Sequence, residues 1–156
     1  MLTKGIVWIM KIKKWNENKI PIQNARNGKI FYTSVKEIDK ELKQHKKHTI
    51  QYKGFALVVE KGPLNSFNGY VVKFPKKLSS TFSENEQNNL AHIKGVYVPH
   101  GGYTSGNGFD CAHHDDFLYI KDLTTQMSSA KSWKTPKYVE SELKKIANSL
   151  LAIANK

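Results

Sequence analysis

Residues 49–74 read TIQYKGFALVVEKGPLNSFNGYVVKF, and they give the strongest indication of the fold class. The first part, 49–60, is rich in β-branched and aromatic residues and contains the continuous apolar run FALVV at 55–59, which is typical of a buried strand. Turn-forming residues occupy 62–69, and YVVKF at 70–74 then predicts the antiparallel partner. The stretch therefore predicts one strand over 49–60 and a β-hairpin within a mainly antiparallel sheet.

Helices are predicted on both sides of this hairpin. Ser34 and Ser83 each open a capping box with a glutamate three residues later, so two short helices are expected, the second extending to residue 93. Thr135 as N-cap and Pro136 at the first helical position begin the clearest helix, which should cover one face of the sheet. Its apolar residues recur at helical spacing: Tyr138, Val139, Leu143, Ile146, Leu150 and Ile153.

The remaining apolar runs predict further strands at 5–14, 29–33, 95–98 and 117–120. The length of 156 residues suits one domain with a substantial core. We therefore expect a single α+β domain over 1–156, with a mainly antiparallel sheet covered by a long C-terminal helix and two short helices. Residues 1–51 form its basic N-terminal part, and residues 52–156 carry the motifs described below.

The net charge of +12 is unevenly distributed. Residues 1–77 hold 17 Lys and Arg against five Asp and Glu, whereas residues 78–156 hold eight of each kind. Lysines such as Lys43, Lys46 and Lys47 could form a surface for a polyanion such as nucleic acid. The aromatic residues interleaved with this basic half could stack bases, although such residues more often fill cores: Trp8, Trp15, Phe31, Tyr32 and Tyr52.

Some protein classes are excluded by composition. A single cysteine excludes an internal disulfide, and no apolar run approaches the roughly 20 residues needed to span a bilayer. The short apolar run at 5–10 leads directly into lysines without a small-residue cleavage site, so it does not resemble a signal peptide. We therefore expect a cytoplasmic protein without a membrane partner.

Most of the chemically versatile side chains lie in residues 98–116, VPHGGYTSGNGFDCAHHDD. The stretch combines histidines, aspartates and the only cysteine with four glycines, which allow the backbone to approach a ligand closely. It matches neither a P-loop nor a dinucleotide fingerprint. We predict that its arms fold together around one concavity. The candidate ligand-binding residues are His100, Gly101, Gly102, Thr104, Asp110, His113 and Asp116.

The pattern HGGxT at 100–104, followed by GFDCAHxxD at 108–116, resembles a family of small uncharacterised bacteriophage and prophage proteins. Weaker matches at 69–75 and 138–142 extend the resemblance over residues 52–153. The chain departs from the family in having Tyr103 where leucine is usual, a shorter loop before the second motif, and no cysteine upstream of residue 69. The resemblance implies a viral setting rather than a particular reaction.

The leading hypothesis is a phage or prophage counter-defence protein that binds a small phosphorylated nucleotide around residues 100–116. His100 and His113 would contact phosphate or base edges. Asp110 and Asp116 would position these two histidines or bind a ribose hydroxyl. The glycines could also orient successive N–H groups toward an anion. An ordinary hairpin loop explains the same glycines without a ligand.

Two other classes of function remain open, and no cofactor is assigned. The same segment could be the active site of a hydrolase, because imidazole and carboxylate ligands suit a divalent metal that activates water. The candidate ligands are His100, Asp110, His113 and Asp116, with His114 and Asp115 beside them. Cys111 paired with His113 could instead be a nucleophile, but we expect it to be buried and dispensable. Alternatively, the basic half could bind a nucleic-acid-loaded host defence complex, as an anti-CRISPR-like inhibitor.

Overall fold

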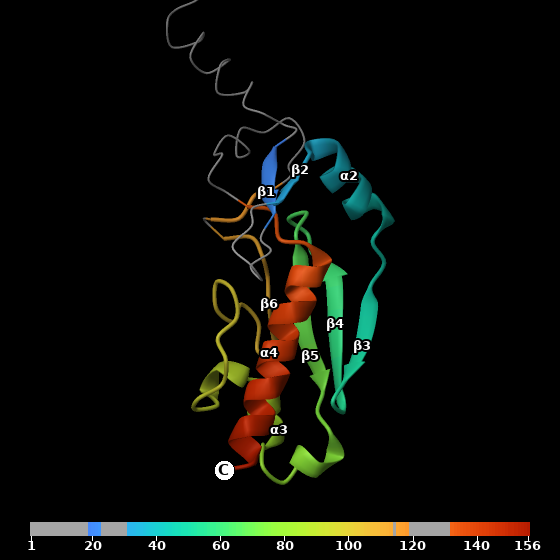
Figure 1. Cartoon of the computed structure of the whole chain (residues 1–156). Coiled ribbons are helices and arrows are strands. Elements are labelled where there is room, and N and C mark those ends of the chain that lie inside the picture. Colours follow the sequence, from blue (N-terminus) through green and yellow to red (C-terminus); the bar gives the residue numbers. More distant parts are fainter. Residues whose placement is uncertain (1–18, 23–30, 114, 119–131) are drawn as a thin grey trace, which may run out of the picture.

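A computed structural model describes residues 19–22, 31–113, 115–118 and 132–156. These residues form an α+β domain with two antiparallel sheets, as predicted (Figure 1). One sheet pairs β1 with β2, and the other has the order β3-β4-β5-β6. The elements are β1 (Ile20–Ile22), β2 (Phe31–Thr33), α2 (Val35–Gln44), β3 (His48–Tyr52), β4 (Phe55–Lys61), β5 (Phe67–Lys73), η1 (Lys76–Leu78), α3 (Glu84–Gln87), η2 (Leu90–His92), β6 (Gly108–Phe109) and α4 (Pro136–Ala154).

The first half of the hairpin region contains a turn that the sequence analysis missed. Instead of one strand over 49–60, β3 and β4 form a hairpin of their own, with Tyr52 paired to Phe55. The two turn residues, Lys53 and Gly54, have φ angles of 50° and 88°. Positive φ at both central residues is typical of the tight turn that matches strand twist, so a glycine after lysine was the available signal.

The second hairpin joins β4 to β5 as predicted, although β5 already begins at Phe67. The far side of β5 pairs with β6, where Gly69 lies opposite Phe109 and Tyr70 opposite Gly108. A Cβ atom at Gly108 would overlap the carbonyl oxygen of Gly69. A glycine is therefore required where the chemically rich segment joins the sheet.

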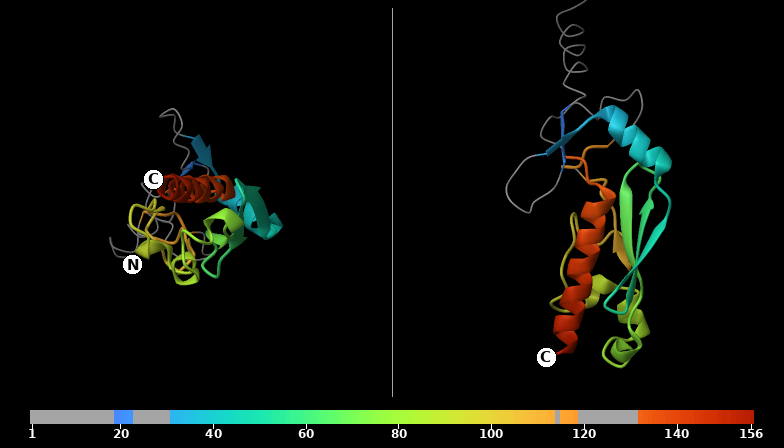
Figure 2. Two further views of the ribbon diagram at one scale, coloured as in Figure 1. Left: turned by 90° about the horizontal axis from the view of Figure 1, so that it is seen from below. Right: turned by 45° about the vertical axis from the view of Figure 1, so that its right-hand side comes forward.

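Helix α4 packs along the sheet against β4 and β5 (Figure 2). It begins as predicted, with the Thr135 hydroxyl accepting a hydrogen bond from the Tyr138 N–H at 3.1 Å and Pro136 in the first turn. A Cβ atom at Gly69 would lie 2.8 Å from Val139 Cγ1, so the missing side chain lets the helix approach β5. The helix buries Val139, Glu142, Leu143, Ile146, Ala147 and Leu150.

The two short helices also form, but the second is shorter than predicted. Ser34 caps α2 through the N–H of Glu37, and Ser83 and Glu86 form a complete capping box at α3. The prediction that this helix continues to residue 93 is wrong, because α3 ends at Gln87. The N–H of Leu90 donates to the carbonyl of Gly106 instead, which attaches the glycine loop to η2.

Two predicted strands are absent from the described residues. At 95–98 the N–H of Tyr97 donates to the Ser149 hydroxyl of α4 rather than to a neighbouring strand. Of 117–120, only 117–118 are described; they are not strand, although the N–H of Phe117 donates to the carbonyl of Ser132. The predictions at 5–14, 29–30 and 119–120 lie outside the described residues. No helix of the described part is long and apolar enough to cross a membrane.

Candidate functional site

The structure brings the predicted histidines and aspartates together beside the N-terminal end of α4. His100 comes from the loop before the glycines, and its Nε2 lies 2.7 Å from Oδ1 of Asp116. The His113 ring is 5.6 Å from the His100 ring, centroid to centroid, and its Nε2 lies 3.0 Å from Oδ1 of Asp110. We call His100, Asp110, His113, Asp115 and Asp116 the His/Asp cluster. His114 lies outside the described residues.

His113 has a defined proton position when the ring is neutral. Its Nε2 faces two oxygen atoms of Asp110, the carbonyl at 3.1 Å and the carboxylate at 3.0 Å. Both are acceptors, so Nε2 must carry the proton and the lone pair resides on Nδ1. The ring is a quarter exposed, so solvent reaches this side chain. His113 therefore has the tautomer of a general base.

The segment that carries these groups is not an extended strand, which changes the predicted pairing of side chains. Alternation along a strand would place the side chains of Cys111 and His113 on the same face. The chain turns instead, so that Asp110 contacts His113 three residues later in the sequence. Cys111 instead packs into the core and is 2% exposed, as we expected. Burial, with a smaller contribution from Asp116, raises the pKa of the thiol far above its ordinary value. The thiol lacks the access and the ionisation that a nucleophile needs.

Asp116 is a buried carboxylate at the centre of the cluster. Its Oδ2 accepts a hydrogen bond from the His113 N–H at 2.9 Å. Burial alone would raise the pKa of Asp116, but the contacts with His100, Lys134 and the His113 N–H outweigh burial and lower the pKa below its ordinary value. Asp116 is therefore ionised at neutral pH despite its burial.

Lys134 is a member of the site that the sequence analysis missed. Its side chain is 3% exposed, and its Nζ lies 2.9 Å from Oδ1 of Asp116. It also donates to the Ser132 hydroxyl. A lysine just before a helix cap does not differ in sequence from the many surface lysines. Only the fold reveals that this one is buried.

Glu142 was also missed, although a sequence signal for it existed. It lies on the apolar stripe of α4 between Val139 and Leu143, where a carboxylate is unexpected. Its carboxylate accepts hydrogen bonds from the Tyr97 hydroxyl at 2.9 Å and from the His100 N–H at 3.0 Å. Burial and the bond to Glu142 raise the pKa of Tyr97 to about 12. Glu142 thus holds the backbone from which the His100 side chain projects.

The glycine loop positions His113 rather than forming an anion cradle. Gly101 has φ of 70°, and a Cβ atom there would overlap the His113 ring. The N–H of Gly102 donates to the Pro99 carbonyl, and the N–H groups of Thr104 and Ser105 donate to the Gly108 carbonyl. These N–H groups are thus used within the loop, and the exposed Thr104 belongs to a turn packed on η2.

A cavity of about 560 Å³ lies against α2. It contains a carboxylate of Glu41, which accepts a hydrogen bond from the Trp133 indole N–H at 2.8 Å. None of the described residues that line it belongs to the His/Asp cluster: Ile22, Thr33, Glu37, Lys40, Glu41, Gln44, His45, Trp133, Thr135 and Pro136.

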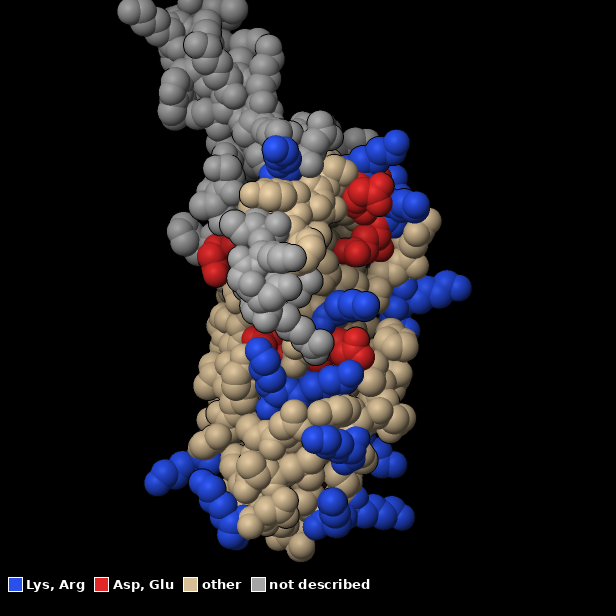
Figure 3. Space-filling view, viewed as in Figure 1, with Lys and Arg blue, Asp and Glu red and all other residues tan. Residues whose placement is uncertain are grey.

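Exposed lysines of the described residues come from both halves of the sequence. Figure 3 shows lysines over the face that carries α4, and no acidic side chain is visible near its C-terminal end among the coloured residues. On this domain Lys53 and Lys144 place their Nζ atoms 5.2 and 5.3 Å from the ring centroid of Tyr52. Asn148 accepts hydrogen bonds from both Tyr52 and Lys53. Lysines of both halves of the sequence therefore meet around one aromatic ring.

Comparison with known proteins finds no matching family model, no matching curated protein and no matching solved structure.

Proposed function

We propose that the protein is a hydrolase that cleaves a phosphoester bond of a small nucleotide at the His/Asp cluster, with His113 as the general base. The observation that carries the proposal is the pair of Asp110 oxygens at Nε2 of His113, which leaves the lone pair on Nδ1. His113 takes a proton from water, the water oxygen bonds to phosphorus, and the bond to the leaving alcohol breaks. Because the attacking and leaving oxygens lie on opposite sides of phosphorus, solvent protonates the leaving alkoxide and His113 returns its proton to water.

Residues in and next to the cluster keep His113 and His100 in place. Asp116 accepts a hydrogen bond from the His113 backbone, while Glu142 holds the backbone of His100. Gly101 leaves the space that the His113 ring occupies. Because the backbone N–H of each histidine donates to a carboxylate, the separation of the two imidazoles is maintained without a substrate.

The tautomer of His113 favours hydrolysis over simple capture of the nucleotide, because capture does not need a proton acceptor. The carboxylates of Asp110, Asp115, Asp116 and Glu142 outnumber the lysines that contact them among the described residues, Lys134 and Lys145. A phosphate held only by this set would meet excess negative charge in either function.

Turnover by a histidine variant tests this proposal. The purified chain is incubated with linear and cyclic nucleotides, and products are measured by chromatography and mass spectrometry. His113→Gln should lower the rate by about 10²–10⁴-fold, since that is the usual contribution of a general base. His48→Gln, an exposed histidine on β3, is the matched control and should be unaffected. Equal rates in both variants, or a bound nucleotide recovered intact from the wild type, would contradict hydrolysis, and the intact ligand would support capture.

The resemblance to phage and prophage proteins supplies a biological setting for the proposal. In that setting the substrate is a nucleotide signal of host defence, and the protein acts as a counter-defence factor in the host cytoplasm. A phage that lacks the gene should then grow poorly only on hosts that produce such a signal.

A second candidate function is binding of a nucleic-acid-loaded host complex through the basic surface. The two lysines at the Tyr52 ring favour it, because an aromatic ring beside cations can stack a base and contact phosphate. Replacing Lys53 and Lys144 by glutamine should then weaken binding to single-stranded nucleic acid and flatten its salt dependence. The same change should leave nucleotide turnover unaltered. Unchanged affinity at two salt concentrations would eliminate this candidate.

A further inference from the structure

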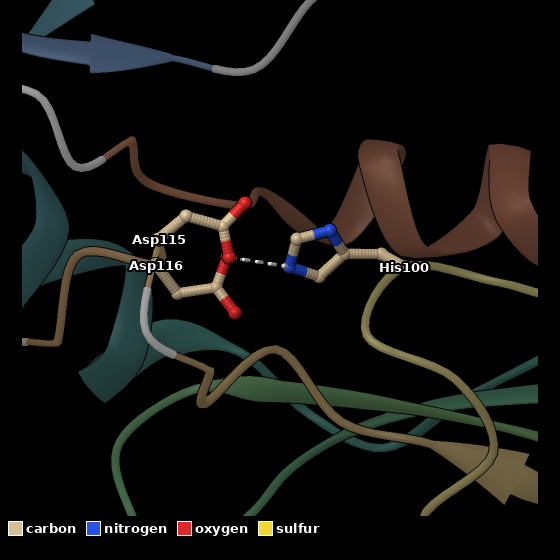
Figure 4. Close-up of side chains that lie close together, drawn as sticks. All are labelled: His100, Asp115 and Asp116. Atoms are coloured by element: carbon tan, nitrogen blue, oxygen red, sulfur yellow. Dashed lines mark ion pairs between the residues drawn. The ribbon is translucent and has the colours of Figure 1, made fainter.

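We propose that His100, Asp115 and Asp116 form a binding site for one divalent transition-metal ion. Figure 4 shows both carboxylates directed toward the ring of His100. The inference rests on the proposed function, since a cation would supply the positive charge that a phosphate substrate needs in this cluster. It also replaces the ligand set expected from the sequence, because Asp110 and His113 bind each other instead.

The spacing of the three ligand atoms fits one ion. Nε2 of His100 lies 2.7 Å from a carboxylate oxygen of Asp116 and 3.8 Å from one of Asp115, and all three atoms are within 4.8 Å of one another. Ligands about 2.0–2.2 Å from a tetrahedral ion are separated by about 3.3–3.6 Å. Small side-chain rotations therefore bring the three atoms to coordination distance.

The alignment of the buried atoms points to a missing ligand. Nε2 of His100 and Oδ1 of Asp116 are both inaccessible to solvent, and the 2.7 Å contact between them lacks the geometry of a hydrogen bond. Oδ1 has an ion pair with Lys134, but Nε2 of His100 has no hydrogen-bond partner among the described residues. Buried polar atoms are nearly always satisfied, so the arrangement around Nε2 needs an explanation. Atoms that are 2.7 Å apart but not aligned with each other can both direct lone pairs at a shared ion.

Lys134 does not occupy the proposed position. Its Nζ lies 2.9 Å from Oδ1 of Asp116, but a carboxylate oxygen has two lone pairs and can serve an ammonium group and a metal together. Asp115 supplies the accessible side of the site, since its side chain is 70% exposed. An ion can therefore enter from solvent next to Asp115 and reach the buried atoms.

The ligand set indicates which ions should bind. Imidazole favours Zn²⁺ and other transition metals, whereas two carboxylates also suit Mn²⁺. Mg²⁺ and Ca²⁺ prefer sites made of oxygen atoms alone. With three ligands from the protein, a position remains for water or a phosphate oxygen. The ion would neutralise the carboxylates and polarise the bound oxygen, and His113 would remain the base.

Metal binding to the full chain is the direct test. The apoprotein is titrated with Mn²⁺ and with Zn²⁺ by calorimetry, and bound Mn²⁺ is followed by electron paramagnetic resonance. We expect one ion per chain, and Asp115→Asn should weaken binding by at least about tenfold. Because Asp115 is exposed, this variant should fold normally. Asp110→Asn is the matched control, since it removes a neighbouring carboxylate outside the proposed ligand set.

The results of the metal titration and of the turnover assay can each contradict the proposed metal site. No binding of either ion at about 1 mM, equal affinity in Asp115→Asn, or a loss in Asp110→Asn alone would overturn it. Turnover provides a separate readout: His113-dependent activity in a chain that binds neither ion would retain the proposed hydrolase and reject the metal site. Metal binding lost in Asp115→Asn without turnover of any nucleotide would retain the site and reject the hydrolase.

Discussion

Replacing Lys134 by methionine should destabilise the fold through Asp116. Both side chains are buried, and their charged atoms are 2.9 Å apart. Methionine fills a similar volume without the ammonium group, so the carboxylate would stay buried and lose one of its charged partners. Breaking a buried ion pair from one side usually costs about 3–5 kcal/mol. The lower end applies here because His100 and the His113 N–H still contact Asp116.

A loss of about 3 kcal/mol lowers the melting temperature of a domain of this size by roughly 6–12 °C. The effect should also depend on pH, because the folded state lowers the pKa of Asp116 from its ordinary value of 3.8. Stability from this group is fully present above the unfolded pKa and is lost as the pH falls through the folded pKa. The difference between wild type and Lys134→Met should therefore shrink below about pH 4.

Urea denaturation followed by circular dichroism at pH 7, pH 4.5 and pH 3 measures this difference. Lys137→Met is the matched control, because Lys137 is exposed on α4 and its replacement should change stability by less than about 0.5 kcal/mol. A loss in Lys134→Met that equals the control, or one that is as large at pH 3 as at pH 7, would refute the assignment of a buried pair with an ionised Asp116.

Two further predictions test the surroundings of the cluster. Cys111 should resist a thiol-alkylating reagent at pH 7 until urea unfolds the chain, because burial removes access and raises the thiol pKa; labelling of the folded chain at the rate of a free thiol would contradict this. Gly101→Ala should lower the melting temperature more than Gly102→Ala. Both positions have positive φ, which costs about 1–2 kcal/mol for alanine, but only at Gly101 does the added Cβ overlap the His113 ring. Equal melting temperatures for the two variants would contradict the overlap.

Local signals in the sequence were sufficient for several elements of the fold. The β4–β5 hairpin and the start of α4 at Thr135 were predicted from residues that are close together in the chain. The prediction of a strand at 95–98 was wrong because it depended on a residue that is distant in the chain. A strand requires a hydrogen-bonding partner, and the partner of the Tyr97 N–H is the hydroxyl of Ser149, 52 residues away.

The site shows the same division between local and long-range information. By itself, the sequence determined that the reactive side chains are concentrated at 98–116 and that Gly101 and Gly102 lie among them. The position of Glu142 on the apolar face of α4 was a further signal in the sequence that we missed. Only the tertiary structure decided that Asp110 binds His113, that Cys111 faces the core, and that Lys134 is buried against a carboxylate. The physical reason is that burial and charge pairing depend on which distant segments pack together, and residue type and spacing do not specify that packing.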